Sequence, residues 1–80
     1  MHCVIYKSRS RQDTYLYLER EGDFSRVPQG LLQLVGQLDR VMDLELIPER
    51  KLAQADVEQV MGLLRDCGYY LQLPPKPLGR

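Results

Sequence analysis

Apolar and polar residues follow one another in short segments along the chain, and the period of each segment predicts a strand or a helix. In four segments without internal glycine or proline, β-branched and aromatic residues alternate with polar ones or run together, as is typical of β-strands. We expect strands over residues 2–7, 14–19, 41–47 and 69–73. In the third of these, Met42, Leu44 and Leu46 share one face, opposite Asp43 and Glu45, which predicts a strand buried on one side.

Two further segments have the period of an α-helix. The apolar residues that follow the i, i+3, i+4, i+7 spacing of an amphipathic helix are Val57, Val60, Met61 and Leu64. This helix is predicted to end at Gly68, and a shorter one is expected between Pro28 and Gly36. The order strand, strand, helix, strand, helix, strand predicts a small two-layer α+β domain, with both helices on one face of a mainly antiparallel sheet.

The length and the charge limit the kind of protein. Eighty residues allow one small domain, which we expect to span residues 1–73, with residues 74–80 as a mobile, proline-rich tail. Eleven basic and eleven acidic residues give a formal net charge of zero, which argues against strong non-specific binding to nucleic acid. Neither a signal peptide nor an apolar run of membrane-spanning length is present, so we expect a cytoplasmic protein without a membrane partner.

A basic hairpin is the first candidate binding surface. Lys7, Arg9 and Arg11 fall within five positions, at the end of the first predicted strand and in the segment that follows it. Residues 1–20 hold four basic and two acidic residues, a local charge of +2 in a neutral chain. Such a group of cations can contact phosphates, although a solvated, flexible loop is the simpler interpretation.

Tyrosines form the second candidate surface. In the strand over residues 14–19 two leucines share one face, and Tyr15 and Tyr17 share the other. If the leucines meet the helices, these tyrosines lie on the open face of the sheet. One of the adjacent residues Tyr69 and Tyr70 must point to the same face, and we take it to be Tyr70. Tyrosines beside arginines can stack RNA bases. The alternatives are that the C-terminal tail covers them or that they form a dimer contact.

A third candidate is Arg26, in the string Asp23-Phe24-Ser25-Arg26-Val27-Pro28. The string has the parts of a helix start, so a structural role in anchoring the loop is the simpler interpretation. A functional role for Arg26 would be contact with an anion near the N-terminus of the helix, where free amides favour negative charge.

The sequence shows no pattern typical of catalysis or of metal binding. His2 and Cys3 are adjacent, but adjacent residues of a strand point to opposite faces. Neither CxxC nor HxxxH spacing is present to support a metal site, and Cys3 and Cys67 are interpreted as free thiols in a reducing compartment. We therefore expect no catalytic residue, no cofactor and no metal, and a protein that is not an enzyme.

Five blocks of sequence resemble the YcgL-domain family of small bacterial proteins. They are residues 3–8 (CVIYKS), 14–17 (TYLY), 23–28 (DFSRVP), 55–58 (ADVE) and 68–75 (GYYLQLPP). The resemblance covers most of the chain in the right order. It implies a compact α/β domain, and it implies no particular biochemical activity.

These observations lead to two hypotheses about function. The first is a non-enzymatic, cytoplasmic interaction module of the YcgL type, whose partner is an unidentified protein. The alternative is an accessory protein that binds single-stranded RNA through the basic hairpin and the sheet tyrosines. The expected working surface is the same in both: Lys7, Arg9, Arg11, Tyr15, Tyr17, Arg26 and Tyr70. The oligomeric state does not follow from the sequence.

Overall fold

A computed structural model describes residues 1–50, 52 and 56–74 of the chain. The elements are β1 (His2–Ser8), β2 (Tyr15–Leu18), α1 (Gln29–Val35), β3 (Leu38–Glu45), α2 (Val57–Cys67) and β4 (Tyr69–Gln72). The strands form one sheet in the order β3-β1-β2-β4, and every neighbouring pair is antiparallel. The predicted α+β class, the order of elements and the antiparallel sheet are confirmed. Of the predicted tail, only Pro74 lies within the described residues.

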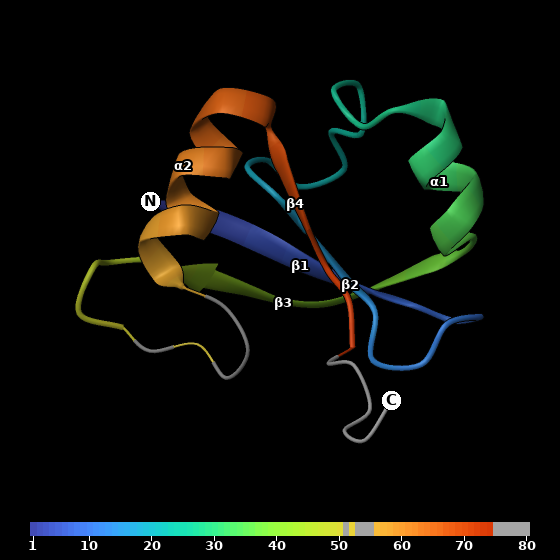
Figure 1. The fold of residues 1–80 in the computed structure, drawn as a ribbon, viewed down its shortest axis with the longest axis horizontal. Coiled ribbons are helices and arrows are strands. Elements are labelled where there is room, and N and C mark those ends of the chain that lie inside the picture. The colour runs from blue at the N-terminus through green and yellow to red at the C-terminus, as the bar shows by residue number, and fades with distance from the viewer. Residues whose placement is uncertain (51, 53–55, 75–80) are drawn as a thin grey trace, which may run out of the picture.

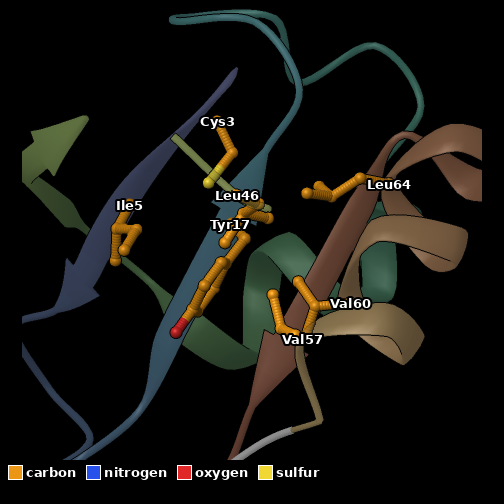
Figure 2. Packing of buried hydrophobic residues seen from close by; sticks show 7 residues of the cluster. All are labelled: Cys3, Ile5, Tyr17, Leu46, Val57, Val60 and Leu64. Atoms are coloured by element: carbon orange, nitrogen blue, oxygen red, sulfur yellow. The ribbon is translucent and has the colours of Figure 1, made fainter. Parts of the chain in front are cut away.

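The two helices lie on opposite faces of the sheet, so the expectation of a two-layer domain with both helices on one face is wrong. Val57, Val60 and Leu64 of α2 pack with Cys3 and Ile5 of β1 (Figure 2). Adjacent residues of a strand point to opposite faces. The domain therefore has three layers, with the sheet between the helices, which flank the strands in Figure 1.

The other face of the sheet packs against α1 and the loop that precedes it. Val4 and Tyr6 of β1 and the two leucines of β2 form a second cluster with Val27. Leu31 and Leu32 of α1 pack against this cluster. The physical reason for the three layers is that β1 and β2 carry apolar side chains on both faces, and each face has to be covered.

Helix α2 begins and ends at residues suited to those positions. The Asp56 side chain accepts a hydrogen bond from the Glu58 amide (3.1 Å), which satisfies one free donor of the first turn. Gly68 has a φ of 84°, in the left-handed region, and its amide donates to the carbonyls of Leu63 and Leu64. The predicted end of the helix is confirmed, and β4 follows directly at Tyr69.

Strand β3 begins three residues earlier than predicted and contains an irregularity. Ile5 pairs with Met42 whereas the next residue of β1, Tyr6, pairs with Arg40, so Val41 is left without a partner in β1. An extra residue of this kind is a β-bulge, which bends the strand and shifts its alternation. β3 lies at one edge of the sheet and β4 at the other.

Candidate functional site

A hollow of about 350 Å³ lies on the face of the sheet that carries α2. Cross-strand pairing builds its floor, because Ile5 lies opposite Tyr17 on one side and opposite Met42 on the other. The residues that line the hollow are Ile5, Asp13, Tyr15, Tyr17, Val41, Met42 and Gln72. None of them belongs to α2, so the helix closes one end of this face and the hollow occupies the other.

The expectation that the tyrosines lie on an open face is wrong for Tyr17. This side chain is only 6% exposed, because α2 packs on its face of the sheet; in Figure 2 its ring lies between Ile5 and Val57. Its hydroxyl donates to the side-chain oxygen of Gln72 (3.0 Å), and burial raises its pKa. The ring of Tyr70 meets it edge to face, with centroids 5.4 Å apart. Tyr17 thus forms part of the core and of the wall of the hollow.

Tyr15 and Tyr70 are half-buried on the same face. Tyr15 lies opposite Lys7 of β1 and opposite Gln72 of β4, and it lines the hollow. Lys7 is exposed beside it. Of the candidate residues, the structure therefore brings Lys7, Tyr15, Tyr17 and Tyr70 together on one face.

The arginines of the basic hairpin donate to groups of the chain itself. The Arg9 Nε atom donates to both carboxylate oxygens of Asp39, at 3.0 and 2.9 Å. This hydrogen bond holds the pKa of Asp39 below its usual value. The Arg11 Nε atom donates to the carbonyl of Leu34 (3.1 Å), in the last turn of α1. Both guanidiniums thus tie the hairpin to neighbouring elements.

Arg26 lies away from the hairpin and contacts the end of α2. Its Nη2 atom donates to the carbonyl of Asp66 (2.7 Å), one of the last carbonyls of the helix, which otherwise lack partners. The side chain also passes Gly68 so closely that a Cβ atom there would lie 2.6 Å from its Cδ. The structural interpretation of Arg26 accounts for these contacts.

Five lining residues of the hollow were not among the predicted site residues: Ile5, Asp13, Val41, Met42 and Gln72. Asp13 lies in the β1–β2 loop with a φ of 57°, a left-handed conformation that Asp tolerates better than most residues. Val41 and Met42 are 48% and 43% exposed. Two consecutive apolar residues before the alternating part of β3 were the only signal for them, because a bulge can bring neighbours to one side.

The groups with chemical reactivity do not form a catalytic arrangement in the part of the chain that the structure describes. Burial raises the pKa of the Cys3 thiol to about 11, so the thiol is protonated at neutral pH and is a poor nucleophile. His2 lies 3.7 Å from Asp43 and 3.9 Å from Glu45, all with exposed side chains. No cluster of three metal-ligating side chains is present among the described residues.

In the described parts of the chain, no helix has both the length and the apolar character that crossing a membrane requires.

These features define a small α+β domain with a helix on each face of its sheet and an open hollow lined by both apolar and polar residues. A family model described as the YcgL domain matches residues 3–75, and the chain belongs to this family.

Named relatives agree with this assignment over nearly the whole chain. A YcgL domain-containing protein of Cronobacter sakazakii is 56% identical over 77 residues, which cover 96% of this chain and 85% of that protein. Protein YcgL of Escherichia coli (strain K12 / DH10B) is 52% identical over 77 residues, covering 96% of this chain and 71% of that protein. A third relative, named putative HAD-like hydrolase, from Nitrosococcus oceani, is 53% identical over 78 residues. There the match covers 98% of this chain but only 21% of the relative.

Proposed function

We propose that the chain is a non-enzymatic interaction module that binds a partner protein through the hollow beside α2. The observation that carries the proposal is the hollow itself, because exposed Val41 and Met42 form one wall of a depression with both apolar and polar lining. An open depression of this kind suits an anchor side chain of a protein partner.

The chemistry of the lining indicates what the anchor would be. The floor and one wall are apolar or aromatic, and the Asp13 carboxylate and the Gln72 amide supply the polar groups. An apolar stem that ends in a hydrogen-bond donor or a positive charge would satisfy both parts of the hollow. We therefore expect the partner to insert a side chain such as lysine, arginine or tyrosine.

The relative from Nitrosococcus oceani supports an interaction role and suggests a first partner. The matched region takes up 21% of a protein named putative HAD-like hydrolase, so a related domain shares a chain with a large additional part. We take a HAD-like hydrolase of the same host as the first partner to test. We also assign the module to the cytoplasm, because both cysteines are free thiols.

The RNA-binding alternative has less support. Arg9, Arg11 and Arg26 all donate to groups of the chain itself, and the ring of Tyr17 is buried. Lys7 and the half-buried Tyr15 and Tyr70 would have to carry the contact with RNA. Base stacking needs an accessible aromatic face, so the observations favour a protein partner.

A binding experiment with matched variants tests the proposal. The immobilised chain is exposed to the host lysate and to a purified HAD-like hydrolase of the host, and the affinity of each captured partner is measured by calorimetry. Met42→Glu places a charge in the wall of the hollow, whereas Leu34→Glu changes an apolar residue of similar exposure on α1. We expect Met42→Glu to weaken binding by about tenfold or more, as for an anchor pocket, and Leu34→Glu to leave it unchanged.

Two results would contradict the proposal. One is a partner whose affinity is equal for both variants, because the hollow would then not be the binding surface. The other is binding to short single-stranded RNA that falls steeply with salt and is lost on Lys7→Ala or Tyr15→Ala, which would establish the RNA alternative.

A further inference from the structure

Strand β3 has a free edge that extends over its centre. In the sheet it pairs with β1 on one side only, and its five central residues, 39–43, are all exposed. Their exposure means that no helix or loop among the described residues covers this stretch. An uncovered edge of this kind presents backbone donors and acceptors to another strand.

The hydrogen bonds at the two ends of β3 fix which residues face the free edge. At one end the Arg9 amide donates to the Gln37 carbonyl (3.0 Å), and at the other the Leu46 amide donates to the Met1 carbonyl (2.7 Å). Along an antiparallel pair, every second residue directs its backbone groups toward the partner strand, and the residues between direct theirs away. Gln37 faces β1, so counting every second residue from it leaves Arg40 facing the free edge. Leu46 also faces β1, and counting back from it leaves Asp43 facing the free edge. The two counts differ by one residue, which is the extra residue of the bulge at Val41.

This spacing makes the edge complementary to itself. If two copies of β3 lie antiparallel about a two-fold axis between Val41 and Met42, Arg40 of each copy lies opposite Asp43 of the other. Val41 of each copy then lies opposite Met42 of the other. Opposite charges and apolar residues in directly facing positions stabilise a strand pair. In a regular strand, residues that face the same edge are an even number of positions apart. Arg40 and Asp43 are an odd number of positions apart, so without the bulge they could not both face the free edge.

We propose that the free edge of β3 binds the same edge of a second copy of this chain, with Arg40 paired to Asp43 across the two-fold axis. The two sheets then join into one continuous antiparallel sheet. A two-fold contact uses the same patch on both copies, so it closes as a dimer. This inference shares Val41 and Met42 with the wall of the hollow, but it is tested separately from the proposed docking, because its experiment uses the chain without a partner.

Three contacts within the chain set the strength of the dimer. The Arg50 Nε atom donates to the Glu45 carbonyl (3.1 Å) and so occupies the end of the edge, which leaves the paired stretch short. Arg40 is held by Glu21, at 3.0 Å from Nε, and its Nη2 atom lies 3.9 Å from Asp43 of the same chain, a pair that competes with the pairing between copies. A guanidinium has five donors, so Arg40 can keep the ion pair with Glu21 and still reach Asp43 of the second copy. A short ladder predicts a weak dimer, measurable at high protein concentration.

Exchange of the two charges tests the pairing directly. In Arg40→Asp, residues 40 and 43 are both acidic, and in Asp43→Arg both are basic, so each variant alone places like charges opposite each other at both symmetric positions. An equimolar mixture of the two variants restores opposite charges at both positions. Sedimentation equilibrium up to roughly 1 mM measures self-association of the wild type, of each variant and of the mixture.

We expect the wild type to dimerise and each single variant to dissociate at least about tenfold more readily. The mixture is expected to form heterodimers of wild-type affinity. Glu21→Gln removes the ion pair between Arg40 and Glu21 without changing the edge, and it should leave the dimer intact. Circular dichroism shows whether each variant is folded. Should a variant not fold, concentration-dependent amide shifts of the wild type confined to residues 38–45 provide the second measurement.

Either of two results would overturn the proposal. A wild type that remains monomeric at the highest concentration, with no shifts along β3, excludes self-association through this edge, and it would leave the edge to a strand of another protein. A wild-type dimer whose single variants still dimerise, or whose mixture does not restore the affinity, would place the contact elsewhere on the surface.

Discussion

The two faces of the sheet are built from alternate residues of the same strands, but they differ in how they are covered. On the α1 face Val4, Leu16 and Leu18 are fully buried, with Val27 from the loop before the helix packed on them. On the α2 face Cys3 and its neighbours are equally buried where the helix lies. Beyond the helix the same face opens into the hollow.

This difference separates residues that stabilise the fold from residues that are available for binding. α1 and its preceding loop together cover one face, whereas on the other face α2 begins at Val57 and covers one end. The open end still has a rigid floor, because Ile5 and Tyr17 are buried within it. An uncovered depression with apolar and polar groups is the kind of surface that the proposed function requires.

The largest expected effect compares one residue from each face. Leu16→Ala should lower the free energy of unfolding by about 2–5 kcal/mol, because it leaves a cavity in a fully buried cluster. Met42→Ala should lower it by less than about 1 kcal/mol, because this side chain is 43% exposed and loses little burial. Urea denaturation of both variants measures the difference. Equal losses would mean that the hollow is part of the core, and the distinction between the two faces would not hold.

A second prediction concerns Gly68, where Arg26 from the α1 side meets the end of α2. Gly68→Ala should cost about 1–3 kcal/mol, because the φ of 84° strains any residue with a Cβ and because that Cβ would lie 2.6 Å from the Cδ of Arg26. Thermal or urea unfolding measures the loss. In an Arg26→Ala background the same substitution should cost less, since only the backbone strain remains. An equal cost in both backgrounds would show that the contact between the two side chains is unimportant.

A third prediction concerns the pH dependence of stability, which we expect from Cys3 at the end of the sheet face that α2 covers. Burial raises the pKa of Cys3 from 9.0 to about 11. Below pH 9 the thiol is protonated in both the folded and the unfolded chain, so it makes no difference to stability with pH. Between pH 9 and 11 the unfolded chain loses the proton first, and stability falls by an amount on the order of 2 kcal/mol.

Unfolding free energies at pH 8 and near pH 11, measured for wild type and Cys3→Ala, test this prediction. The loss with pH should be smaller in the variant, although Tyr17, whose pKa is also raised by burial, contributes in the same direction. A thiol reagent at neutral pH provides a control, because it should modify exposed Cys67 and leave buried Cys3 unmodified. Equal reactivity of the two thiols would contradict the burial of Cys3 under α2.

The elements of the fold could be predicted from the sequence because their periods are local. The spacing of Val57, Val60 and Leu64 identified the buried stripe of α2, and Gly68 identified its end. The faces that the helices cover could not be derived from period alone, since each face depends on how the chain crosses the sheet. The run Cys3–Tyr6 held the missed signal: four consecutive apolar residues are typical of a strand that is covered on both faces.

The candidate site was harder to predict because it depends on contacts between distant segments. The tyrosines were correctly grouped on one face, but the packing of α2 on that face decides that Tyr17 is buried. The sequence also indicated a basic hairpin. Only the pairing of β1 with β3 shows that Arg9 reaches Asp39, thirty positions away. The bulge that exposes Val41 has one weak sequence signal, the two consecutive apolar residues Val41 and Met42.

The smallest expected effect concerns this ion pair, which lies where β1 and β3 meet near the open end. The hydrogen bond from Arg9 holds the pKa of Asp39 below its usual value. Arg9→Gln should return the pKa of Asp39 toward that value, as measured by NMR titration of its carboxyl group. Both side chains are exposed, so solvent screens the pair, and the free energy of unfolding at neutral pH should change little. A large loss of stability would mean that the hairpin depends on this pair, and that the open end is less rigid than the closed one. An unchanged pKa would instead mean that Arg9 is free in solution, which would return it to the set of residues available to an anionic partner.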